Sequence, residues 1–125
     1  MLPRTVADHL ADLRFSAPLD GAARTGEARS GARLVVRLGL WLGEGEAVVR
    51  ARYRASTCAA LLAYAEAACA LLEAGEPPAG LGPGRLRAAV RGVHPVHLDR
   101  ADLVARALAA AAAHPHPPAV PGVNA

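Results

Sequence analysis

The sequence RLVVRLGLWLGEGEAVVRARYRASTC at residues 33–58 decides the fold of this chain. Its first half alternates with a period of two, which is typical of a β-strand. Apolar side chains share one side of that strand: Leu34, Val36, Leu38, Leu40 and Leu42. The other side carries Arg33, Val35, Arg37, Gly39 and Trp41.

A second strand is predicted after the turn GEGE at 43–46, whose length suits a hairpin. One side of this strand carries Val49, Ala51, Tyr53 and Ala55, and the other carries Val48, Arg50, Arg52 and Arg54. We therefore expect an antiparallel hairpin with one apolar face toward the core and one arginine-lined face toward solvent.

Helices are expected before and after the hairpin. Upstream, Val6, Leu10 and Leu13 recur at helical spacing and predict a short helix over 3–13, followed by a loop or short edge strand over 14–32.

Downstream, an Ala/Leu-rich helix is predicted over 58–74 with Ser56-Thr57 as its N-cap, and two more helices over 84–91 and 100–113. This order predicts an α+β domain with helices packed on one face of a small antiparallel sheet.

Length and composition fit one domain over residues 1–113. The chain has 125 residues, of which 53% are apolar and only 3% aromatic. A chain of this size buries enough surface to fold without disulfide staples. Residues 114–125 are Pro-rich and lack apolar periodicity, which predicts a disordered tail. The net charge of +3 is too small to indicate a nucleic-acid partner.

The cellular location is predicted to be the cytoplasm. No run of about 18 uncharged apolar residues is present, so no membrane span is expected. The residues after Met1 lack the apolar region of a secretory signal. The two cysteines, Cys58 and Cys69, fall on one predicted helix too far apart to bridge, and we expect reduced thiols.

Cys58 is the strongest candidate for chemistry, because it stands where a strand is followed by a helix. Helix N-terminal amides stabilise a thiolate and thereby favour reactivity or metal binding. The structural alternative is a small buried residue in an Ala-rich helix. Cys69 lies among Ala and Leu in the helix interior and is expected to fill the core.

His94, His97 and Asp99 place two imidazoles and one carboxylate within six residues, a set that suits zinc or iron. A loop of this length gives the three groups no common face. The alternative is therefore two surface histidines and a carboxylate that caps the following helix.

Five arginines on the hairpin are candidates for a docking face: Arg33, Arg37, Arg50, Arg52 and Arg54. On one side of a sheet, their guanidinium groups would suit an acidic partner, and the alternative is an ordinary solvated face. The chain contains no serine elbow, phosphate loop, CxxC or HExxH motif, so we expect a protein that is not an enzyme.

Several segments, in this order, resemble the IscU/NifU-type iron–sulfur cluster scaffold domain over about residues 2–113. The opening VADH at 6–9, with Arg14 and Leu19-Asp20 after it, is similar to the first helix and DHYxNPRN segment of that family. The stretch RASTC at 54–58 matches the family's Gly-Cys at a helix start. The segment Val93, His94, Pro95, Val96 and His97 resembles the family segment that a dedicated chaperone binds.

The resemblance implies an IscU/SufE-like fold with a three-stranded antiparallel sheet, whose third, short strand lies near 24–29. It also implies where cluster ligands would stand. Family members use three cysteines assisted by Asp or His, and these places fall here on Ser30, Ala32, Cys58, Asp99 and Arg100. Since a [2Fe–2S] cluster needs four thiolate or imidazole ligands, the monomer is not expected to hold one.

The expected function is that of a divergent scaffold-like protein of iron–sulfur cluster assembly. Cys58 would act as a persulfide acceptor or as a metal ligand beside Asp99 and His97, with iron or zinc as the candidate metal. The partners implied are a cysteine desulfurase or other iron–sulfur assembly proteins, and no membrane. Two alternatives stay open: a protein-interaction or regulatory module of the same fold, and a zinc- or iron-binding accessory protein.

Overall fold

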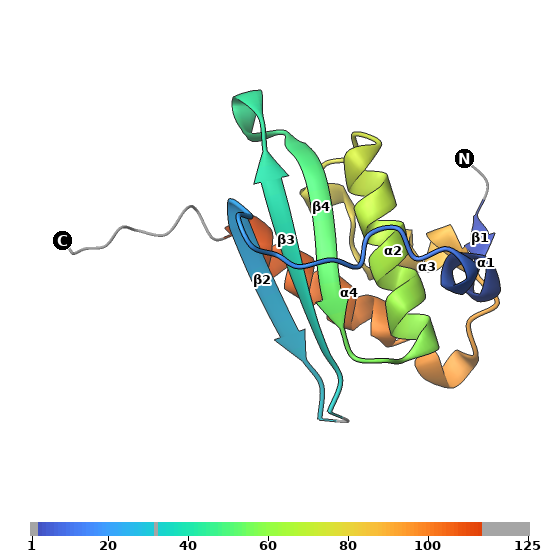
Figure 1. Cartoon of the computed structure of the whole chain (residues 1–125). Helices are drawn as coiled ribbons and strands as arrows, with labels where there is room; N and C mark the ends of the chain where they lie inside the picture. Colours follow the sequence, from blue (N-terminus) through green and yellow to red (C-terminus); the bar gives the residue numbers. More distant parts are fainter. Residues whose placement is uncertain (1–2, 32, 114–125) are drawn as a thin grey trace.

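The computed structural model of the chain describes residues 3–31 and 33–113. Its centre is a three-stranded antiparallel sheet in the order β2-β3-β4, formed by Arg24–Arg29, Val35–Leu42 and Val48–Ala55. Helix α2 (Ala59–Glu73) packs on β4, and helix α4 (Arg100–Ala113) packs on β2 and β3 (Figure 1). The predicted α+β class is confirmed, including the third strand at 24–29.

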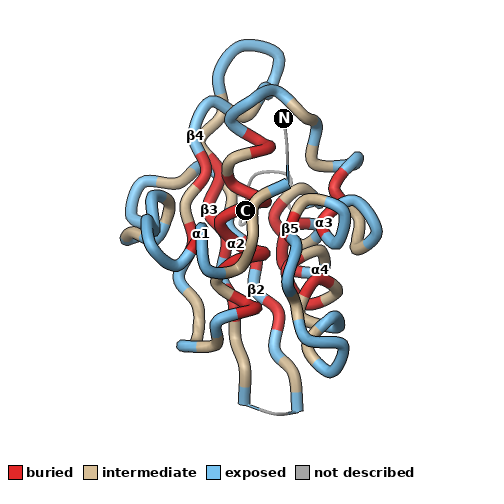
Figure 2. Tube along the Cα trace, turned by 90° about the vertical axis from the view of Figure 1, so that its right-hand side faces the viewer, coloured by how far each residue is buried: buried red, intermediate tan, exposed pale blue. Residues whose placement is uncertain are grey.

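The inner face of the hairpin forms the core that the alternating pattern predicts. Leu38 lies opposite Tyr53 and Leu40 opposite Ala51, and all four side chains are buried. Figure 2 shows the buried positions gathered between the strands and α2.

The register changes once, between Trp41 and Leu42, where Trp41 lies opposite Arg50 but Leu42 lies opposite Val48. The skipped residue, Val49, is 61% exposed, whereas Val48 packs against the core. The inward orientation predicted for Val49 is therefore wrong, because a β-bulge adds one residue and reverses the alternation beyond it.

The outer face of the sheet is partly covered by the chain between α1 and β2. Tyr53 N donates to Phe15 O at 3.0 Å and Ala17 N donates to Tyr53 O at 3.1 Å, so this segment pairs with the free edge of β4. Farther along, Leu19 packs over Gly39 in the middle of β3. The arginine-lined face is thus only partly open to solvent.

The N-terminal helix is shorter than the predicted 3–13. Helix α1 spans Val6–Ala11, and a reciprocal capping box between Thr5 and Asp8 fixes its start. Arg4–Thr5 forms strand β1, which pairs in parallel with β5 (Val90–Arg91), a pairing the sequence did not predict.

Of the three apolar residues that predicted this helix, only Val6 packs against the core. His9 is 4% exposed, whereas Leu10 and Leu13 are exposed. Because α1 ends at Ala11, Leu13 lies outside the helix and only His9 and Val6 face its neighbours.

The remaining helices lie close to their predicted places. Helix α2 begins at Ala59, α3 spans Pro83–Ala89, and α4 has the predicted bounds. Three short 3₁₀ helices connect elements: η1 (Glu44–Glu46), η2 (Pro78–Gly80) and η3 (Pro95–His97). The predicted tail at 114–125 and Ala32 lie outside the described residues. In the described part of the chain, no helix is long and apolar enough to cross a membrane.

Ser56 does not cap α2 as predicted. Its hydroxyl accepts from Val35 N at 2.9 Å and donates to Val35 O at 3.3 Å, so it joins the ends of β3 and β4. The N-cap position of α2 is taken by Cys58 itself.

Candidate functional site

Two of the predicted ligand positions, Ser30 and Cys58, lie near one end of the sheet. Strands β2 and β4 finish, and α2 begins, at the same end of the molecule (Figure 1). Ser30 directly follows β2, where its N–H donates to Leu34 O at 2.9 Å and its carbonyl accepts from Arg33 N at 3.2 Å. The chain turn after β2 and the turn before α2 therefore lie at the same end of the sheet, with the start of β3 between them.

Cys58 is a free, half-buried cysteine at the N-cap of α2. Its backbone is extended, with φ −140° and ψ 120°, and its carbonyl accepts the first helical hydrogen bond, from Leu62 N at 2.9 Å. Its side chain makes no capping bond to the first turn. The sulfur is thus available to react at the positive end of the helix dipole.

Arg100, the first residue of α4, contacts Cys58. The proximity of the Cys58 side chain is the largest cause that raises the pKa of Arg100, and the hydrogen bond from Nη1 to Asp99 Oδ1 at 2.7 Å adds to it. The Arg100 side chain is only 19% exposed, and its Nε is buried without a hydrogen-bond partner among the described residues. A permanent cation therefore lies against the sulfur.

The Cys58 sulfur lies beside two sources of positive charge. These are the N-terminus of α2 and the Arg100 guanidinium. Chemically, the site offers one partly exposed thiol. Cys69 is buried, and burial raises the pKa of its thiol well above the usual range.

We expect iodoacetamide to alkylate Cys58 at least about tenfold faster than Cys69 in the native protein. Cys69 is fully buried, so the reagent has little access to it. Cys58 is only half-buried and lies beside the positive charge of Arg100. Peptide mass spectrometry over a time course measures both rates. Arg100→Gln is expected to slow Cys58 and leave Cys69 unchanged, and equal rates at the two cysteines would contradict the prediction.

The histidines do not join Cys58 in a metal site. His94 and His97 lie 5.9 Å apart between ring centroids around η3, and His94 Nδ1 accepts from Val96 N at 3.2 Å. Across residues 3–31 and 33–113, no three His, Cys, Asp or Glu side chains form a group that could hold a metal ion. Cys58, His97 and Asp99 are therefore not assembled as ligands, and the Asp99 carboxylate pairs with Arg100 instead.

The segment similar to the family's chaperone-bound stretch lies at the surface. It runs from Val93 through η3, and the side chains of His94, Pro95 and Val96 are exposed. It immediately precedes the Asp99–Arg100 pair, so a partner bound there would lie near the start of α4.

The five arginines do not share one open face. Arg33 lies in the turn between β2 and β3 with a positive φ of 69°. Arg52 pairs with Glu73 at 2.5 Å and lies over the Phe15 ring at 5.4 Å. Arg50 lies over Trp41 at 5.1 Å.

Arg37, Arg50 and Arg54 are exposed on the outer face, and Arg37 and Arg54 lie directly opposite each other on β3 and β4. Glu27 on β2 lies 3.6 Å from the Arg37 guanidinium.

Two buried polar residues were missed by sequence reasoning. Glu66, in the middle of α2, is 2% exposed and accepts three hydrogen bonds: from Arg14 N at 2.9 Å, Phe15 N at 3.0 Å and Tyr53 Oη at 2.9 Å. The other is His9. A lone carboxylate inside an Ala/Leu helix was the available signal, because a charged residue is buried only where partners meet it.

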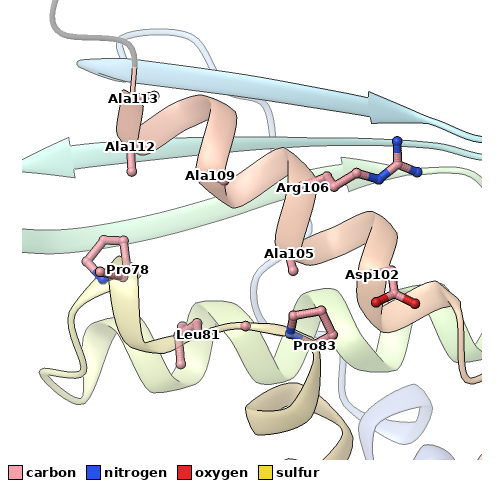
Figure 3. A pocket seen from close by; sticks show the side chains of 11 residues that line it. Pro78, Leu81, Pro83, Asp102, Ala105, Arg106, Ala109, Ala112 and Ala113 are labelled. Atoms are coloured by element: carbon pink, nitrogen blue, oxygen red, sulfur yellow. The ribbon is translucent and has the colours of Figure 1, made fainter.

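A groove of about 650 Å³ lies beside α4 (Figure 3). Ala105 and Ala109 line one side of it, and Pro78, Leu81 and Pro83 line the other. Its walls are mainly small and apolar, and it does not include Cys58.

No protein-family profile matches this chain, and no curated protein matches it at a significant level.

Proposed function

We propose that this protein is a divergent, scaffold-like member of the iron–sulfur cluster assembly proteins in which Cys58 accepts sulfur as a persulfide. The observation that carries the proposal is the contact between Cys58 at the start of α2 and Arg100 at the start of α4. The resemblance aligns both residues with cluster-ligand positions. Their proximity supports that alignment, since the two residues are distant in sequence.

The sulfur transfer requires one nucleophile and no external oxidant. The Cys58 thiolate attacks the outer sulfur of a donor persulfide, the donor's S–S bond breaks, and the donor leaves as a thiolate with the bonding electron pair. A new S–S bond forms on Cys58, and the transferred sulfur then releases its proton to water, which leaves a persulfide anion on Cys58. Arg100 and the N-terminus of α2 stabilise that charge.

The ligand chemistry favours sulfur acceptance over holding a cluster. Ser30 offers a hydroxyl, which binds iron–sulfur centres poorly, and Asp99 offers a hard oxygen already paired with Arg100. Arg100 has no acceptor atom at all. Iron or zinc bound through Cys58 would need further ligands from a partner, such as a cysteine desulfurase or another assembly protein.

Incubation with glutathione persulfide tests the proposal. We expect Cys58 to gain one sulfur atom, seen by intact-mass and peptide mass spectrometry, and Cys58→Ser to gain none. Cys69→Ser is the matched control and should behave as the wild type. Arg100→Gln should slow the uptake by about tenfold, equivalent to about 1.4 kcal/mol in the barrier. Uptake that persists in Cys58→Ser would overturn the proposal.

One observation favours a second function, that of an interaction module for an acidic partner. Arg37 and Arg54 lie directly opposite each other at exposed positions, and like charges in such cross-strand pairs are destabilising. An acidic surface bound there would relieve the repulsion. An interaction module does not require Cys58, so the persulfide experiment distinguishes it from the sulfur-acceptor function.

A further inference from the structure

A second cavity, of about 260 Å³, lies away from Cys58, between α1, β1 and α2. These N-terminal elements pack on the side of α2 that faces away from the sheet (Figure 1). Its walls are mainly apolar, with Phe15 and Ala70 among them, and its polar lining includes Arg4, His9 and Glu66. The volume is slightly below the roughly 300–1,000 Å³ of drug-sized sites, so the cavity suits a small ligand.

His9 is the polar group in this cavity that lacks a partner. It is 4% exposed, and its Nε2 is buried with no hydrogen bond among the described residues. Buried polar atoms are nearly always paired, so an orphaned one calls for an explanation such as an absent ligand. Burial is the largest cause that lowers the pKa of His9, with the charge of Arg4 acting in the same direction and that of Glu66 opposing both.

Three other charged groups line the cavity: Arg4, Arg14 and Glu66. Arg14 is already paired with Asp12 through Nε at 2.6 Å. Glu66 is satisfied, because both of its oxygens accept hydrogen bonds from the protein. Arg4 donates through Nη2 to Asp8 O at 3.0 Å, and a guanidinium has further N–H groups to offer. A ligand entering the cavity therefore meets the Arg4 guanidinium and the His9 ring, whose Nε2 lies buried behind the cavity surface.

We propose that this cavity binds a small monocarboxylate with an apolar body, its carboxylate between Arg4 and His9 Nε2 and its body beside Phe15 and Ala70. The positive charge of Arg4 favours an anion. The negative charge of Glu66 in the same wall disfavours a doubly charged group such as phosphate. The apolar walls favour a ligand whose remainder is hydrocarbon. This site is independent of Cys58 and of the proposed sulfur transfer.

Benzoate is the probe for this site, and benzamide, its neutral counterpart, is the ligand control. We expect benzoate to shift the His9 ring signals in NMR spectra with a dissociation constant below about 10 mM. His9→Phe, which keeps an aromatic ring but removes both nitrogens, and Arg4→Gln should each weaken binding about tenfold or more, as followed by the Phe15 ring signals. Ala70→Leu should fill the cavity and abolish binding, and Arg106→Gln, an equal charge change on α4 outside this cavity, should leave it unchanged.

Each other outcome overturns the proposal. Benzamide or inorganic phosphate binding as tightly as benzoate would show that a single carboxylate is not what the site recognises. Benzoate binding retained in a folded Ala70→Leu or His9→Phe variant would place the ligand elsewhere. No response to benzoate up to about 10 mM, in wild-type protein shown to be folded by its NMR spectrum, would show that the cavity does not bind this class.

Discussion

Replacing Glu66 by alanine is expected to lower the free energy of unfolding by about 3–5 kcal/mol. The carboxylate joins three parts of the fold, because it accepts from the backbone N–H groups of Arg14 and Phe15 and from the Tyr53 hydroxyl. Alanine would leave two backbone donors and one buried hydroxyl without an acceptor. Urea denaturation followed by circular dichroism measures the change.

Three variants separate this network from a general effect of losing a carboxylate. Glu66→Gln keeps the shape and one acceptor, and should cost less than Glu66→Ala. Glu44→Gln, at an exposed position in η1, should change stability by no more than about 0.5 kcal/mol. Tyr53→Phe in a double-mutant cycle should show coupling with Glu66 of at least about 0.5 kcal/mol. A Glu66→Ala loss as small as that of Glu44→Gln would contradict the role assigned to Glu66.

Replacing Gly26 by alanine is expected to destabilise the protein by about 3 kcal/mol or more. Gly26 in β2 is the point where the sheet approaches α4 most tightly among the described glycines, and a Cβ there would fall on backbone atoms of Ala107 and Ala111. Backbone cannot rotate away as a side chain can, so strand and helix would have to separate. Thermal and urea unfolding measure the loss.

Gly84→Ala is the matched control for Gly26→Ala. Gly84 lies within α3, and a methyl group added there would meet no other atom within 4 Å, so alanine should stabilise the helix by about 0.5–1 kcal/mol. A Gly26→Ala variant as stable as the wild type would mean that β2 and α4 are not packed backbone to backbone.

The elements with long, regular patterns could be predicted from the sequence. The alternation through 34–42 and 51–55 predicts the hairpin, and the Ala/Leu composition of α2 and α4 predicts two buried helices. The third strand, Arg24–Arg29, has no clear alternation of apolar residues. The residues alone left a loop or short edge strand over 14–32, and the position at 24–29 was predicted only through the family resemblance. Short elements failed for the same reason. Six residues of α1 and two each of β1 and β5 carry too little pattern to show which side faces inward.

Part of the candidate site could be predicted as well. Cys58 at a strand-to-helix junction follows from local sequence, since the end of one pattern and the start of the next fall on either side of it. The contact between Cys58 and Arg100 was suggested only by the aligned ligand positions. The two side chains meet because α4 packs against α2. The Glu66 network joins residues 14, 15, 53 and 66, and such a contact leaves no periodic trace.

Local sequence was sufficient to predict a hairpin with Ala-rich helices and the position of Cys58, because these features depend on neighbours along the chain. Which polar groups are buried and which arginines are exposed depends instead on how the layers pack. The segment from Phe15 to Leu19 crosses the outer face of the sheet and engages Arg52, and α1 turns His9 inward. Burial and charge partners are set by residues far apart in sequence, and those become neighbours only in the folded protein.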